Sequence, residues 1–171
     1  MILEEYNFKK VVKEQKVCIE LPKDWIGKEV EIIVKPVDLL NLKAIQNELT
    51  LLIQDLFWVS ESDEPFELMN ELQIPENTRI EKWVVDKLNL DKPIEIATID
   101  FFFKNVIVHH EWQDEAAKES VDKFKRIYQL FQTKFEETIV LRSGDFEKKI
   151  LIIGKTADNE LVILKTKSIE S

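Results

Sequence analysis

The side chains with the greatest capacity for chemistry stand together in the segment SESDE, residues 60–64. Its three carboxylates and two hydroxyls could make a catalytic acid pair, ligate a divalent cation or bind a basic partner. A calcium loop of the EF-hand type needs a longer ladder of oxygen ligands and a central glycine, and this segment has neither. The apolar residues LFWV precede it, and Pro65 and Phe66 follow it. The pattern predicts an ordered acidic loop, for which solubility and partner binding are both open readings.

Outside this segment, the sequence carries no pattern typical of a catalytic or metal-binding site. Three glycines in the whole chain are too few to favour a phosphate-binding glycine loop. His109 and His110 are adjacent, so on a strand or helix they point apart and do not form the zinc pair of an HExxH helix. Cys18 is the only cysteine, which excludes a disulfide framework within the chain. We therefore expect no enzyme, no cofactor and no metal ion of its own.

The charge of the chain bears on its partners and its location. The net charge is −9, and residues 1–37 hold seven lysines and seven acids, so residues 38–171 carry all of it. An acidic domain disfavours binding to nucleic acid, whose phosphates attract lysine and arginine side chains. It suits binding to a basic protein, such as an enzyme that acts on nucleic acid. Solubility alone is the simpler interpretation of the charge. No apolar run approaches the ~18 residues of a membrane span, and the N-terminus lacks the basic region of a signal peptide. We expect a cytoplasmic protein without membrane contact.

The hydrophobic pattern predicts a mixed α+β fold for residues 38–171. Helices are predicted where apolar residues recur every three or four positions, at 38–57, 77–88 and 114–135. Strands are predicted at 66–72, 94–99, 138–141, 148–154 and 160–166. Residues 150–153 and 161–164 are continuously apolar, and a strand of this kind is usually covered on both faces. The sheet should therefore lie between two helical layers.

Residues 1–37 have the pattern of a separate small module. Residues 17–21 and 30–34 are typical of two short strands, joined by a turn that contains Pro22 and Gly27. A hairpin rarely stands alone in water, so this one should pair with its copy in a homodimer or dock on the rest of the chain. It weakly resembles the β modules of small bacterial antitoxin-like proteins, some of which bind DNA, but its zero net charge argues against a strong phosphate contact.

Four motifs, taken in order, resemble the nuclease A inhibitor-like family. They are LFWVSESDEPFE, TIDFFFKN, the EWQDE that begins the long helix, and the tail LVILKTKSIES. The resemblance covers about residues 39–171 and is most specific in the S-E-S-[DE]-x-P-F-E signature. It implies an inhibitor that blocks the active site of a sugar-nonspecific, magnesium-dependent DNA/RNA nuclease. Together with the pattern above, it predicts a three-layer α-β-α sandwich with a mainly antiparallel central sheet, preceded by the N-terminal β-hairpin.

The resemblance also implies which residues meet the nuclease. Glu61 corresponds to the glutamate that reaches basic residues of the cleft, and Trp112 to an aromatic contact before the long helix. The end of the chain, which is Ser here where characterised members have Thr, corresponds to the group that approaches the partner's catalytic metal. Residues 1–37 have no counterpart in the family domain. The residues expected to bind the partner are Ser60, Glu61, Ser62, Asp63, Glu64, Glu111, Trp112, Glu170 and Ser171.

Two other functions are open alternatives on the sequence. One is an antitoxin-like regulator, in which the N-terminal hairpin binds an operator or dimerises and the acidic domain binds a toxin. The other is a domain that keeps the family fold but has lost nuclease binding. The preferred reading is a nuclease inhibitor that is not an enzyme.

Overall fold

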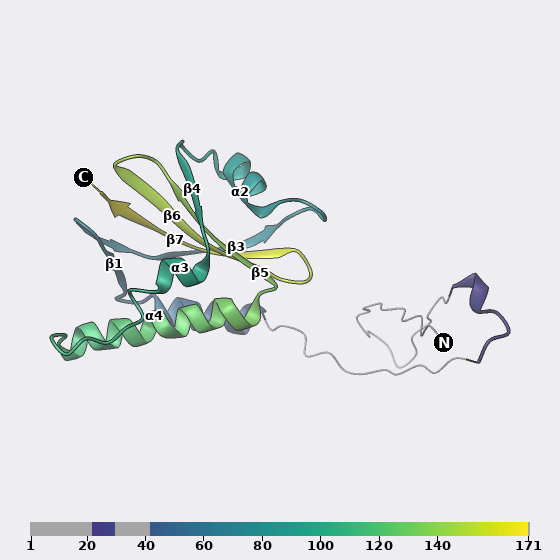
Figure 1. The fold of residues 1–171 in the computed structure, drawn as a ribbon, viewed down its shortest axis with the longest axis horizontal. Coiled ribbons are helices and arrows are strands. Elements are labelled where there is room, and N and C mark those ends of the chain that lie inside the picture. Colours follow the sequence, from purple (N-terminus) through teal and green to yellow (C-terminus); the bar gives the residue numbers. More distant parts are fainter. Residues whose placement is uncertain (1–21, 30–41, 171) are drawn as a thin grey trace. The chain divides into compact units, whose positions relative to one another are not determined.

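The computed structural model of the chain describes residues 22–29 and 42–170 (Figure 1). The chain divides into two units, Met1–Val37 and Asp38–Ser171. In the first unit, the described residues form a short 3-10 helix, η1 (Lys23–Trp25). The two strands predicted for this unit, and the start of the first predicted helix at Asp38, lie outside the described residues. The hairpin and its pairing therefore stay predictions.

The second unit is built on a five-stranded sheet with the strand order β3-β7-β6-β5-β4. Its edges are β3 (Glu67–Gln73) and β4 (Ile94–Ala97). Its centre consists of β5 (Glu137–Ser143), β6 (Glu147–Lys155) and β7 (Glu160–Ile169). Every neighbouring pair is antiparallel. The predicted α+β class with an antiparallel sheet is confirmed, and so are the strands predicted in the last third of the chain.

Four α-helices accompany the sheet in the described part of the chain: α1 (Leu42–Leu52), α2 (Ile80–Leu88), α3 (Ile99–Phe103) and α4 (Glu115–Lys134). The predicted start of α4 is confirmed, because the side chain of Asp114 accepts a hydrogen bond from the Ala117 N–H at 2.8 Å. Such a cap satisfies one of the N–H groups that have no partner inside the helix.

The sequence pattern placed two helix boundaries wrongly and missed one helix. The first helix ends at Leu52 and not near residue 57, because the chain turns at Asp55, whose φ is 55°, to enter a strand. The second helix begins after Asn77, which also has a positive φ of 57°. The strand predicted to residue 99 gives way to α3, whose N-cap Thr98 accepts a hydrogen bond from the helix backbone. In each case a local turn overrides the apolar periodicity.

Two buried clusters occupy the two faces of the sheet, and β6 shows how they divide. Ile150 and Ile152 belong to the cluster that includes residues of α1, α3 and α4. Leu151 and Ile153 belong to the cluster that includes residues of α2. Successive side chains of a strand point to opposite faces, so a continuously apolar strand supplies both clusters. Figure 1 shows α3 and α4 on one side of the sheet and α2 on the other.

A second, two-stranded sheet is formed by β1 (Phe57–Val59) and β2 (Asp63–Pro65). The strands are antiparallel, with Trp58 opposite Glu64. The acidic segment predicted to be a loop therefore forms the turn of a short β-hairpin and the first two residues of its second strand.

Deletion of residues 1–37 should leave Asp38–Ser171 folded, because the two units are compact separately and the described members of both buried clusters lie in residues 45–164. Circular dichroism and thermal melting of the truncated chain test this expectation against the full-length protein. Gel filtration of the same pair tests whether residues 1–37 change the oligomeric state. A truncated chain without secondary structure would show that the first 37 residues belong to the core.

Candidate functional site

The acidic segment forms a tight turn at the end of the β1–β2 hairpin. The Ser60 N–H donates a hydrogen bond to the Ser62 carbonyl at 3.0 Å, which closes the turn. The Ser62 hydroxyl donates to the Glu64 carboxylate at 2.9 Å. Glu61 and Asp63 are exposed, whereas Glu64 is half-buried. The hydroxyls of this segment therefore organise the turn, and two of its carboxylates face water.

The base of the hairpin is held by aromatic packing. The ring of Trp58 stacks on Phe102 of α3, with 4.6 Å between centroids, and meets Phe124 of α4 edge-on at 6.1 Å. Phe66, directly after β2, is buried and packs against the same Phe124 at 5.9 Å. The apolar residues on either side of the acidic segment thus fix the hairpin onto two helices, as their position in the sequence suggested.

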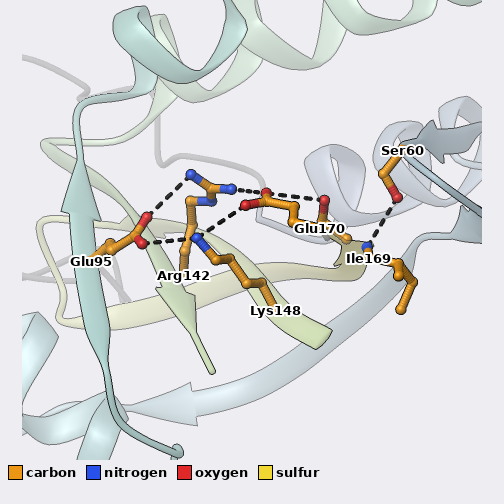
Figure 2. Close-up of polar contacts among 7 residues, drawn as sticks. Ser60, Glu95, Arg142, Lys148, Ile169 and Glu170 are labelled. Carbon is orange, nitrogen blue, oxygen red and sulfur yellow. Dashed lines mark hydrogen bonds and ion pairs between the residues drawn. The ribbon is translucent and has the colours of Figure 1, made fainter. Parts of the chain in front are cut away.

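The side of the hairpin is joined to the end of β7. The Ser60 hydroxyl accepts a hydrogen bond from the Ile169 N–H at 3.0 Å (Figure 2). The Glu61 N–H donates to the Ile169 carbonyl at 3.4 Å. Further back, the Thr166 hydroxyl donates to the Pro65 carbonyl at 2.9 Å. Ser60 and Ile169 are 109 positions apart in the sequence. The structure therefore brings together the acidic turn and the end of the last strand, two of the predicted contact segments.

Glu170 is tied down by both its backbone and its side chain. Its N–H donates to the Phe146 carbonyl at 2.9 Å, in the turn between β5 and β6. Its Oε2 lies 3.0 Å from the Lys148 Nζ, and its Oε1 contacts Arg142 and accepts from the Ser168 hydroxyl. Both carboxylate oxygens therefore have partners inside the chain.

A second carboxylate completes a closed arrangement that we call the Glu170 ring: Glu95, Arg142, Lys148 and Glu170. Arg142 Nη1 lies 3.1 Å from Glu95 Oε2, and Lys148 Nζ lies 2.8 Å from Glu95 Oε1. Each cation bridges both carboxylates (Figure 2). The Lys148 and Arg142 side chains are only 14% and 27% exposed. The ring holds two positive and two negative groups and is neutral overall.

The ring shifts the pKa of Lys148 and the pKa of Glu170 toward the charged state. Hydrogen bonding to Glu95, and then to Glu170, raises the pKa of Lys148. For Glu170, partial burial is the largest single influence and acts to raise the pKa. The hydrogen bond from Lys148 and the charges of Arg142 and Lys148 together outweigh it, so the pKa of Glu170 is lowered.

Trp112 forms a separate exposed feature before α4. Its side chain is 80% exposed, and its ring stacks on His110 with 5.5 Å between centroids. Glu111 is exposed beside it. In Figure 1 the start of α4, the β1–β2 turn and the end of β7 all lie toward the left edge of the view. Ser171 lies outside the described residues.

Neither the Glu170 ring nor Phe146, whose side chain is 76% exposed beside Glu170, was predicted from the sequence. A signal was present in the strands. Arg142 stands two positions after Val140, and Lys148 two positions before Ile150, so both share a face with core residues. Charged residues at such positions need partners. Finding the partners required the strand register, which places Glu95 opposite Arg142.

Neither a metal site nor a membrane span is found in residues 22–29 and 42–170. Groups of three or more His, Cys, Asp or Glu side chains that could hold a metal ion do not occur there. His109 instead contacts the Asp122 carboxylate at 2.7 Å. None of the helices in these residues is long and apolar enough to cross a bilayer.

Residues 43–171, about three quarters of the chain, match the model of a protein family described as nuclease A inhibitor-like protein. The chain belongs to this family. The resemblance read from the four sequence motifs is confirmed. The nuclease A inhibitor-like match starts one residue inside α1 and extends through the acidic turn and the Glu170 ring. A search among curated proteins found no match.

Substitution Glu170→Gln should destabilise the protein by about 1 kcal/mol at neutral pH, since the ion pairs of the ring are partly open to water. The folded-state pKa of Glu170 is lowered, so its stabilising effect is present above the ordinary value of 4.5. The effect is lost as the pH falls below that value through the lowered pKa. Urea unfolding of wild type and variant should therefore give a free-energy difference that shrinks toward pH 3.

The exposed Glu111 offers a matched control for this titration. Glu111→Gln should change the free energy of unfolding little at any of these pH values. A difference between wild type and Glu170→Gln that persists unchanged in acid would show that the carboxylate is not held in its charged form.

Proposed function

We propose that this chain is a protein inhibitor of a sugar-nonspecific, magnesium-dependent DNA/RNA nuclease and performs no catalysis itself. Family membership supports a nuclease as the partner. The observation that carries the proposal is the pair of hydrogen bonds between the acidic turn and Ile169. They unite two segments that the family resemblance assigns to the nuclease contact, although these segments are far apart in the sequence.

The chemistry of a nuclease cleft explains why such a surface would inhibit. The cleft combines a divalent cation with basic side chains that bind phosphate oxygens. Carboxylates presented from a rigid turn can take the same donors without offering a bond to cleave. Because the turn is braced by Trp58 and Phe66 at its base and by Ile169 at its side, little ordering remains to oppose binding.

Within this surface we assign different roles to the acids. Glu61, at the centre of the turn, pairs with desolvated basic residues of the cleft. Asp63 and Glu64 lie nearer the rim and act through longer-range attraction. Ser60 and Ser62 hold the turn in shape, as their hydrogen bonds indicate. Trp112, with Glu111 beside it, supplies an aromatic contact outside the cleft.

The end of the chain at Ser171 approaches the metal of the nuclease in this proposal. A carboxylate and a hydroxyl are the hard oxygen ligands that magnesium prefers, and this ion commonly keeps several bound waters. The contact can therefore be direct or pass through a metal-bound water. We further infer that the two buried clusters make the family domain a three-layer α-β-α sandwich, and that residues 1–37 serve dimerisation or docking.

Substitution Glu61→Gln should weaken inhibition of nuclease A by about 2–5 kcal/mol, the cost of leaving buried basic groups without a charged partner. Asp63→Asn removes the same charge from the same hairpin and is the matched control. It should mainly slow association and reduce the dependence of the association rate on salt. Inhibition constants from plasmid degradation, with association rates at two salt concentrations, separate the two effects. Equal small losses would show that the turn contributes only diffuse charge. A wild-type protein that inhibits no sugar-nonspecific, magnesium-dependent nuclease, nuclease A included, would overturn the proposed function.

A short tag appended after Ser171 should weaken inhibition far more than the same tag placed before Met1, because only the first would obstruct the approach to the metal. Both tagged proteins should melt at the temperature of the untagged protein. The comparison needs the same plasmid assay and a thermal melt. Tight inhibition by the C-terminally tagged protein would exclude the end of the chain from the active site.

A further inference from the structure

Glu170 is bonded to its own chain through both its backbone and its side chain. Here the backbone of Glu170 is bonded to Phe146 and its carboxylate to Lys148 and Arg142. The preceding residue, Ile169, is bonded to Ser60 on the opposite side. The sequence motifs alone assigned Glu170 to the partner, but both of its oxygens face cations of its own chain.

We propose that Glu170 is a positioning residue, held by Lys148, Arg142 and Glu95 so that the chain leaves β7 in one direction toward the nuclease metal. In this role Glu170 does not ligate the metal; it aims the residue that follows it. The inference rests on the proposed function, because it concerns how the end of the chain reaches the active site.

The geometry explains why a single anchored residue is sufficient. One residue spans at most about 3.6 Å of extended chain, so a fixed Glu170 limits the positions that the residue bonded to it can reach. An end that is already confined loses less conformational freedom when it enters the cleft, and preorganisation of this kind strengthens binding. The ring thus orders the end of the chain before binding, so that less conformational entropy is lost when the nuclease binds.

A substitution in the ring can distinguish a positioning role from simple electrostatic attraction, because the two predict opposite changes in inhibition. Substitution Lys148→Gln removes a positive charge and leaves the surface beside the acidic turn more negative. Electrostatic attraction alone would then bind a basic nuclease more tightly. Positioning predicts weaker inhibition, because Glu170 loses a partner that lies 3.0 Å away. The sign of the change distinguishes the two.

Lys149 provides the matched control, since it is the next residue of β6 and points to the other face of the sheet. Its ammonium pairs with Asp91 at 2.9 Å and has no contact with Glu170 among the described ion pairs. Lys149→Gln therefore changes the net charge by the same amount and also breaks one ion pair. We expect Lys148→Gln to weaken inhibition of nuclease A about tenfold or more, and Lys149→Gln to leave it unchanged or slightly tighter. Inhibition by Lys148→Gln as tight as that of wild type would overturn the inference.

Deletion of Ser171 in both backgrounds separates this inference from the proposed function. If Glu170 acts by aiming Ser171, the deletion weakens inhibition in the wild type but has little further effect in Lys148→Gln. Equal losses in the two backgrounds would overturn the positioning role and leave the proposed function intact. A deletion without effect in the wild type would instead overturn the contact between the chain end and the metal, and the positioning role with it.

Amide hydrogen exchange gives a readout that needs no nuclease. The Glu170 N–H, bonded to the Phe146 carbonyl, should exchange about tenfold faster in Lys148→Gln than in wild type, because the local anchor is loosened. Exchange at buried core positions and the melting temperature should change little, and Lys149→Gln should resemble wild type throughout. An unchanged rate at Glu170 would show that the ring does not hold the end of the chain.

Discussion

The hydrogen bonds between the acidic turn and Ile169 are the contact on which the candidate site depends. The β1–β2 hairpin has three residues in each strand, and a hairpin of that size has little stability in water by itself. Trp58 anchors its base in the core, and β7 supports the turn through the two hydrogen bonds of Ile169. The last strand of the sheet therefore acts as the scaffold for a turn that precedes it by about a hundred residues.

A second constraint is that two cationic side chains lie beside the acidic turn, whose negative charge is needed to attract a basic partner. Arg142 and Lys148 are largely buried near the acidic turn, and uncompensated they would repel a basic partner. Glu95 and Glu170 neutralise them within the chain. Because the ring is neutral, the excess of 33 acidic over 24 basic residues is carried by the residues outside it. The ion pairs that neutralise these cations also hold the strands together. One carboxylate, Glu95, comes from β4, and the other, Glu170, directly follows β7 on the far side of β5 and β6.

The fold could be predicted where local pattern and tertiary structure agree. The apolar runs of β6 and β7 and the capped start of α4 are strong local signals, and the four family motifs identified the domain. The end of α1 and the whole of α3 were missed, because the turn at Asp55 and the helix cap at Thr98 override the apolar pattern. The acidic turn was recognised as ordered, but its attachment to Ile169 and the pairing of Glu170 with Lys148 follow from strand register, which the sequence pattern does not specify.

The attachment of the turn to β7 also has a consequence for how the molecule is assembled. Closing a longer loop costs more entropy, and contacts between distant residues form late in folding. The bond between Ser60 and Ile169 spans 109 positions and requires β7 to be in place first. A growing chain on the ribosome would have its acidic segment exposed for most of synthesis without the shape that a nuclease could recognise. The binding surface is therefore a late product of folding, and its presence reports that the sheet is complete.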